Sequence, residues 1–151
     1  VYMIKLVISP EYFGNNDSQR YIREQLKKLG AHSIEIDKTT GFVSALMTVD
    51  NYESFVEGLK KRIEKIAADI KEKYSGVKDI RFNGDYTVFY VKISRLSKNE
   101  RKNVVFDLLM ASATYQVISG IPQTDASIKV KFYDGDDKLV ECVDTAERKK
   151  V

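Results

Sequence analysis

The chain repeats one pattern three times: a helix-start signal, an amphipathic helix, and two alternating strands joined by a polar turn. Each signal pairs a side-chain hydrogen-bond acceptor with an amide or carboxylate three residues later, the spacing of a capping box. The three signals are Asn16 with Gln19, Asp50 with Glu53, and Ser97 with Glu100. Hairpins force antiparallel neighbours, and helices recurring between them must cover a face of the sheet, which restricts the fold class strongly.

Apolar periodicity predicts the three helices. The first is expected over Asp17 to Leu29 and the second over Tyr52 to Tyr74. The third, Lys98 to Ser119, is apolar or small on nearly all sides after its charged first turn, which predicts burial on most sides. We expect three of its side chains to be almost wholly buried: Val105, Leu108 and Leu109.

Alternating patterns bounded by turn residues predict the strands. They cover Tyr2 to Ser9, His32 to Asp37, Phe42 to Val49, Val77 to Phe82, Tyr86 to Ile93, Ile128 to Tyr133 and Leu139 to Val143. The hairpin turns fall near Thr40-Gly41, Asn83-Gly84-Asp85 and Asp134-Gly135-Asp136. Asn-Gly is the strongest short hairpin signal, so we expect a positive φ at Gly84.

The predicted order is therefore β-α-ββ-α-ββ-α-ββ, an α+β fold. We expect one largely antiparallel sheet of about seven strands with three helices packed on one face. A chain of 151 residues can bury a sizeable core, so residues 1–151 are expected to form a single domain. The charged tail, about residues 145–151, is expected to fray.

The sequence offers few residues for chemistry. Cys142 is the sole cysteine, which excludes an intrachain disulfide and a thiolate metal cluster, and its strand position predicts a buried structural thiol. His32 is the sole histidine, so no histidine pair can act in catalysis or hold a metal. We interpret His32 as a partly exposed residue at a strand edge.

Known site motifs are also missing. The eight glycines form neither a phosphate-binding loop nor a dinucleotide fingerprint, and no serine lies in a nucleophile elbow. The acidic group Asp134, Asp136 and Asp137 faintly resembles a calcium loop but lacks the bidentate glutamate, and turn formation explains it more simply. We predict no catalytic, cofactor-binding or metal-binding residues, no cofactor, and no enzymatic activity.

Basic clusters raise the alternative of nucleic-acid binding. They lie at Lys60 to Arg62, Arg95 to Lys102 and Arg148 to Lys150, in a chain with nine tyrosines. Acidic residues are interspersed among the helical lysines, which is typical of a solvated helix face, and the net charge is only +3. A cytoplasmic nucleic-acid-associated domain therefore stays an alternative, as does an enzyme whose dispersed site a single sequence does not reveal.

Strand alternation identifies a candidate partner-contact face. Lys129, Lys131 and Tyr133 point opposite to their apolar neighbours in one strand, and Lys5 does the same in the first strand. If all helices cover the other side of one sheet, these four side chains share its open face. We expect any partner to bind there, although a merely solvated face explains the same pattern.

Several segments resemble an uncharacterised family of secreted, lipid-anchored proteins of Gram-positive, chiefly clostridial, bacteria. They are ISPEYFG at 8–14, GFVSALMT at 41–48, IRFNGDY at 80–86, YQVISG at 115–120 and IKVKFYD at 128–134. The resemblance covers nearly the whole chain, but none of these segments is a catalytic motif, so no site residue transfers.

The resemblance implies an extracellular protein, anchored to the membrane by a lipid on a cysteine upstream of this chain. The chain opens at Val1 instead of methionine, and we expect an upstream segment to have been removed. The implied function is a non-catalytic binding or structural module of the cell surface. Its expected partner is a surface protein or a cell-wall glycan, with nucleic acid disfavoured.

Overall fold

The computed structural model describes residues 2–8, 10–13 and 18–148. Its strands are β1 (Met3–Ile8), β2 (His32–Ile36), β3 (Val43–Thr48), β4 (Val77–Phe82), β5 (Val88–Ile93), β6 (Lys129–Tyr133) and β7 (Leu139–Asp144). Its α-helices are α1 (Gln19–Lys28), α2 (Val49–Lys73), α3 (Lys98–Ile118) and α4 (Thr145–Arg148), with short 3₁₀ helices at Pro10–Phe13 and Gln123–Asp125. The threefold succession of a helix and an antiparallel hairpin is confirmed.

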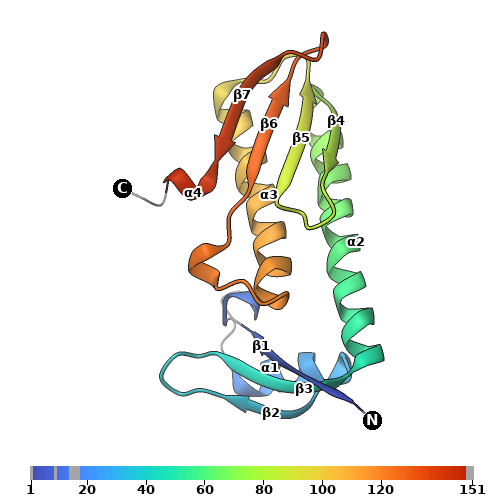
Figure 1. Cartoon of the computed structure of the whole chain (residues 1–151), viewed down its shortest axis with the longest axis vertical. Helices are drawn as coiled ribbons and strands as arrows, with labels where there is room; N and C mark the ends of the chain where they lie inside the picture. The colour runs from blue at the N-terminus through green and yellow to red at the C-terminus, as the bar shows by residue number, and fades with distance from the viewer. Residues whose placement is uncertain (1, 9, 14–17, 149–151) are drawn as a thin grey trace.

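The strands form two sheets, one at each end of the molecule (Figure 1). Their orders are β1-β3-β2 and β4-β5-β6-β7, so the α+β class is confirmed but the single seven-stranded sheet is wrong. Strand β3 pairs with β1 on one edge and with β2 on the other, and no strand of the second half pairs with the outer edge of β1 or of β2. Within the larger sheet β5 and β6 pair in parallel, and α3 makes the crossover between them.

Helix α2 joins the two halves along the long axis (Figure 1). Its 25 residues correspond to a length of about 37 Å. Phe55 and Leu59 on α2 pack in the core of the three-stranded sheet, whereas Ile63, Ala67 and Ile70 pack in the core of the four-stranded sheet. One apolar stripe therefore serves two cores. The assignment of residues 1–151 to a single domain stays a prediction.

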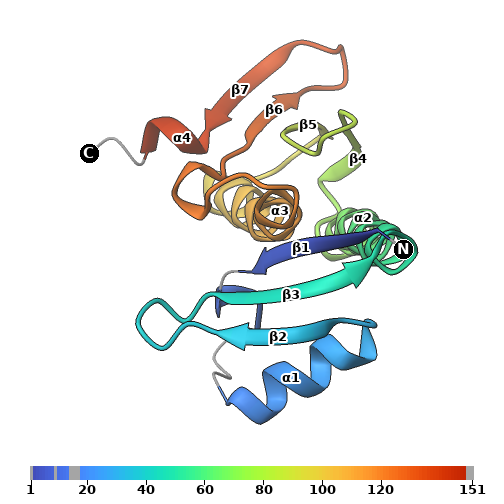
Figure 2. The ribbon, with the colours of Figure 1, turned by 60° about the horizontal axis from the view of Figure 1, so that its bottom comes forward.

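Each sheet is buried on one face. Helix α1 lies beside β2 in Figure 2, and its Ile22 and Leu26 join β-strand side chains in the first core. Helices α2 and α3 lie side by side behind the four-stranded sheet (Figures 1 and 2). The second core is built around fully buried side chains of β5, β6 and α3: Phe89, Val91, Val130, Phe132, Val104 and Leu108. The opposite face of this sheet is left uncovered by helices.

Helix α3 is less enclosed than its composition predicts. Val105 and Leu108 are buried as expected, but Leu109 is only half-buried. Phe106 and Met110 are 60% and 53% exposed, so the prediction of burial on most sides is wrong for this face. The sheet occupies one side of α3 and α2 another, and no further element of the described chain covers the side that carries Phe106 and Met110.

The buried side of α3 holds a polar network. The Ser112 hydroxyl donates to the Tyr86 carbonyl, and Gln116 Nε2 donates to Ser112 Oγ at 2.9 Å and to the Ser127 carbonyl at 2.8 Å. The Ser127 amide donates in return to Gln116 Oε1 at 3.2 Å. Because these buried groups are partnered, the network fixes α3 against the loops before β5 and β6 at little desolvation cost.

The three helix starts differ from one another. The Ser97–Glu100 capping box is confirmed by reciprocal hydrogen bonds of 3.1 and 3.0 Å. The box predicted at Asp50 is wrong, because β3 runs directly into α2 and Thr48 Oγ1 caps the helix instead. Asn16 lies outside the described residues, and Ser18 Oγ accepts from the Tyr21 amide at 3.5 Å to cap α1.

The turn between β4 and β5 differs from the predicted one. Gly84 lies outside the positive-φ region, and the left-handed residue is Tyr86, with φ of 58°. The Tyr86 amide donates to the Asn83 carbonyl at 3.2 Å, and Asn83 Oδ1 accepts from the Thr87 amide at 3.0 Å. This is a type I turn closed by one left-handed residue, so the strained position falls two residues later than expected.

The β6–β7 turn is built in the same way. Asp134 takes the place of Asn83, since its Oδ1 accepts from the Lys138 amide at 3.0 Å, and Asp137 is the left-handed residue with φ of 60°.

In the β4–β5 turn, ring packing explains how a tyrosine is retained in the left-handed conformation. The centroid of the Tyr86 ring lies 5.1 Å from the ring centroids of both Phe82 and Tyr115.

The C-terminal segment is ordered further than predicted. Thr145 is buried, and its hydroxyl accepts from the Ile128 amide at 2.8 Å, while its own amide donates to the Ile128 carbonyl. These bonds attach the start of α4 to the start of β6. Fraying from residue 145 is therefore wrong, and residues 149–151 lie outside the described chain.

Leu108 is fully buried where α3 meets the sheet. Leu108→Ala should lower the free energy of unfolding by about 2–5 kcal/mol through lost transfer energy and a residual cavity. Lys102→Ala on the same helix, at an exposed position outside the core, is the control and should change it by less than about 1 kcal/mol. Urea denaturation of both variants tests this, and equal midpoints would contradict the assigned core.

Two glycines should respond oppositely to alanine. A Cβ at Gly84 meets nothing within 4 Å, so Gly84→Ala should leave stability unchanged or raise it by up to about 1 kcal/mol. A Cβ at Gly76 would lie 1.8 Å from the Arg95 carbonyl oxygen, so Gly76→Ala should cost about 1–3 kcal/mol or prevent folding. Thermal unfolding followed by circular dichroism separates the two, and a destabilised Gly84→Ala would refute the turn assignment.

Candidate functional site

The uncovered face of the four-stranded sheet, here called the outer face, collects polar and aromatic side chains. Along β5, the side chains of Phe89 and Val91 point into the core. Because successive side chains of a strand point to opposite faces, Tyr90 and Lys92 point outward. The same alternation on β6 turns Lys129, Lys131 and Tyr133 outward, and on β4 it turns out Asp79 and Arg81.

Strand pairing arranges these residues in rows across the sheet. The parallel register of β5 and β6 places Tyr90 opposite Lys131 and Lys92 opposite Tyr133. The antiparallel register of β4 and β5 adds Arg81 beside Tyr90 and Asp79 beside Lys92. Each row therefore joins an aromatic ring to charged groups from neighbouring strands.

The two tyrosines on the central strands form an aromatic pair. The ring centroids of Tyr90 and Tyr133 lie 6.4 Å apart with an interplanar angle of 27°. Lys131 Nζ lies 5.8 Å from the Tyr90 ring centroid, within cation–π range. Tyr90 stays 38% exposed, so a flat apolar surface is open to solvent beside a cation.

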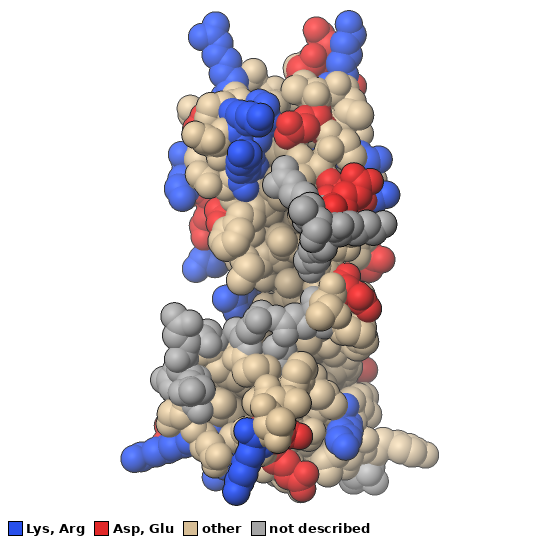
Figure 3. Space-filling view, turned by 90° about the vertical axis from the view of Figure 1, so that its left-hand side faces the viewer, with Lys and Arg blue, Asp and Glu red and all other residues tan. Residues whose placement is uncertain are grey.

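The surface around the face carries both signs of charge. Figure 3 views the molecule from the left-hand side of Figure 1, and Lys and Arg side chains stand out at both ends, with Asp and Glu among them. On the outer face Arg81 Nε lies 3.0 Å from Asp79 Oδ2, and Lys92 Nζ lies 3.5 Å from Asp137 Oδ1. Exposed pairs of this kind contribute little to stability but orient the side chains.

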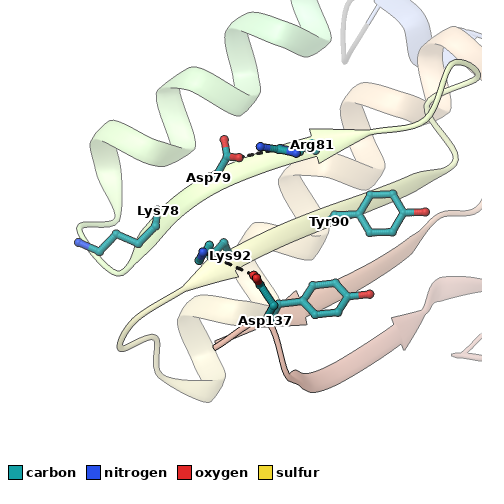
Figure 4. Close-up of a pocket in the computed structure, with 7 residues that line it drawn as sticks. Lys78, Asp79, Arg81, Tyr90, Lys92 and Asp137 are labelled. Carbon is teal, nitrogen blue, oxygen red and sulfur yellow. Dashed lines mark hydrogen bonds and ion pairs between the residues drawn. The ribbon is translucent and has the colours of Figure 1, made fainter. Parts of the chain in front are cut away.

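These residues border a depression of about 540 Å³. Figure 4 shows Asp79 beside Arg81 on β4 and Asp137 reaching from the β6–β7 turn toward Lys92, with Tyr90 farther along β5. Lys78 and Tyr133 complete the lining. Within the described residues, Lys78, Lys129 and Lys131 have no ion pair, which leaves three cations for an incoming anionic group.

The structure unites three of the four predicted contact residues. Lys129, Lys131 and Tyr133 share the outer face, whereas Lys5 is exposed on β1 in the other sheet. The prediction grouped Lys5 with them only because it assumed one continuous sheet. It missed Tyr90, Lys92 and Arg81, although the alternation in Val88–Ile93 marks the first two as outward-facing.

Two single residues have different outcomes. His32 is exposed at the start of β2, an edge strand, as expected. Cys142 is exposed, so its predicted burial is wrong. The register places Cys142 opposite Lys131 on the outer face, while Val143 takes the inward position.

The acidic residues are explained by turns and ion pairs. Asp134 Oδ1 accepts from the amides of Asp136 and Lys138, which is turn chemistry. Among the described residues, no three His, Cys, Asp or Glu side chains come together in a group that could hold a metal ion. No helix in the described part of the chain is both long enough and apolar enough to cross a bilayer.

Three described groups have a clearly shifted pKa, and all lie away from the outer face. Burial raises the pKa of Tyr86, and nearby Glu64 and Tyr115 raise it further. Burial also raises the pKa of Tyr12, partly opposed by the positive charge of Arg62. The Thr40 and Thr39 amides donate to Asp37 in its turn and lower the pKa of that carboxyl. Fold geometry accounts for each shift.

Comparison of the chain with protein-family models, with curated proteins and with solved structures found no match. The resemblance to lipid-anchored surface proteins therefore stays a prediction, and the function must be argued from the outer face.

The raised pKa of Tyr86 predicts loss of stability in alkali. The unfolded chain releases the phenol proton from about pH 10, while the folded protein retains it to higher pH, so the free energy of unfolding should fall as the pH rises above about 10. Tyr86→Phe should weaken this fall relative to the parent. Urea titrations between pH 8 and pH 11 measure it, and identical pH slopes for the two proteins would contradict the assignment.

Proposed function

We propose that this protein is a non-catalytic binding module of the bacterial cell surface, which binds an anionic cell-wall glycan through the outer face of its four-stranded sheet. The observation that carries the proposal is the exposed Tyr90–Tyr133 pair, with Lys131 against one ring and unpaired lysines around it. Extracellular location and an upstream lipid anchor belong to the same proposal and rest on the sequence resemblance.

The chemistry of the outer face suits an anionic sugar polymer. Tyrosine rings offer flat apolar area with little conformational entropy to lose, against which the apolar face of a sugar ring can pack. Lys78, Lys129 and Lys131 can meet carboxylate or phosphate groups, and the carboxylates of Asp79 and Asp137 can accept hydrogen bonds from hydroxyls. The site is an open sheet face, which suits a polymer that extends beyond it.

The absence of a reactive constellation supports a binding role. The outer face has no histidine among its described residues, and no hydrogen bond from a described residue reaches Cys142, its one thiol, which lies opposite Lys131. Activation of a nucleophile needs a base within hydrogen-bond reach.

Single-stranded nucleic acid is a second candidate ligand for the same face, and it would imply a cytoplasmic protein. Aromatic side chains on the two central strands, Tyr90 on β5 and Tyr133 on β6, can serve as a base-stacking surface. Asp79 and Asp137 lie in the same depression and would oppose a strand that carries a phosphate at every nucleotide, whereas they can accept hydrogen bonds from the many hydroxyls of a sugar polymer with fewer charges. The glycan is therefore the better match.

Binding to purified cell walls tests the proposal. The double variant Lys129→Glu with Lys131→Glu should bind the cell wall at least about tenfold more weakly. It replaces two cations that have no ion pair with carboxylates, and these carboxylates repel an anionic ligand. Tyr90→Ala should weaken binding by a similar factor while retaining the charges, since it removes the exposed ring.

A matched control reverses two exposed lysines at the other end of the molecule, Lys5→Glu with Lys27→Glu. It changes the net charge equally and should bind like the parent. Equal retention of parent, control and outer-face variants, all folded by circular dichroism, would refute the outer face as the site.

Oligonucleotide titrations distinguish the second candidate. Nucleic-acid binding should show a steep linear decline of log affinity with log salt concentration, and it should exceed cell-wall binding at equal ionic strength. That result would replace the glycan proposal.

A further inference from the structure

The helices leave a second surface uncovered, on their side away from the sheet. A groove of about 460 Å³ runs between α2 and α3, and its described lining comes only from these helices and Tyr12. Ile66 and Ala111 form part of its floor as half-buried side chains. Phe106 and Met110 border it at 60% and 53% exposure, one helical turn apart on α3. Adjacent large apolar side chains this exposed are typical of an interaction surface.

The charges that flank the groove are of both signs. Helix α2 places Arg62 before Ile66, and Asp69 and Lys73 after it, on the same face. Asp107 lines the groove from α3. None of these four charged residues has an ion pair among the described residues. Along this face of α2 the charges are therefore a cation at Arg62, a carboxylate at Asp69 and a second cation at Lys73.

We propose that two copies of this chain pack groove to groove about a twofold axis passing near Ile66 and Met110. The charge order makes the surface self-complementary. Arg62 precedes Ile66 by four residues and Asp69 follows it by three, distances of about 6 and 4.5 Å along the helix. A twofold axis at Ile66 therefore sets Arg62 of each copy opposite Asp69 of the other copy, so this ion pair forms twice in the dimer.

The resulting dimer has a simple architecture. Helices α2 and α3 of both copies form a four-helix layer, with Phe106 and Met110 buried in its centre. The two four-stranded sheets lie outside this layer, so both outer faces stay open and point away from each other. The dimer does not depend on the proposed glycan function, although it would make any outer-face binding bivalent.

Sedimentation velocity of the full chain over a range of concentrations measures the association. The parent should pass from monomer to dimer as concentration rises, and Met110→Glu should remain monomeric because it places a charge in the centre of the interface. Tyr90→Ala on the outer face is the control and should dimerise like the parent. A parent that is monomeric at every concentration would overturn the proposal.

Charge exchange tests the pairing and its symmetry with exposed residues whose substitution leaves the core intact. Arg62→Asp and Asp69→Arg should each weaken dimerisation about tenfold, because each sets like charges opposite one another. The double variant should recover most of the affinity, and an equimolar mixture of the two single variants should form a mixed dimer.

Single variants that weaken association without recovery in the double variant would refute the twofold pairing. Dimers unaffected by Met110→Glu and by both single charge variants would place the interface elsewhere. Binding of a different protein to the groove of a strictly monomeric parent would likewise replace this proposal.

Discussion

The structure depends on one helix whose apolar stripe is shared by two cores. Phe55 and Leu59 of α2 are buried against the three-stranded sheet, and Ile63, Ala67 and Ile70 of the same helix are buried against the four-stranded sheet. Helix α3 reinforces the connection, since Ile118 at its end packs in the first core while Leu108 packs in the second. Side chains of α2 thus help to bury the apolar faces of both sheets.

Strand pairing decides where surface chemistry gathers. The first hairpin pairs with β1 alone, and the second and third hairpins pair with each other through the parallel contact of β5 and β6. That contact brings Tyr90 beside Tyr133 although they are far apart in sequence. A different pairing of the same hairpins would have scattered the lysines and tyrosines of the outer face.

The two uncovered surfaces differ physically. The outer face presents tyrosines and mixed charges, some of them held in ion pairs such as Arg81 with Asp79 on β4. The groove between α2 and α3 instead leaves Phe106 and Met110 in contact with water, which carries a hydration cost that association removes. The first surface therefore suits reversible ligand binding and the second suits a protein interface.

Local patterns in the sequence determined the helices, the hairpins and the direction of most side chains. The Ser97–Glu100 capping box and the inward alternation of Phe89 and Val91 depend on neighbours within a few residues, so they are readable from the chain alone. Only the tertiary structure decided the division into two sheets, the exposure of Cys142 and Phe106, and the meeting of Tyr90 with Tyr133. Strand-edge pairing and helix coverage depend on contacts between distant segments, and those contacts leave no periodic signal in the sequence.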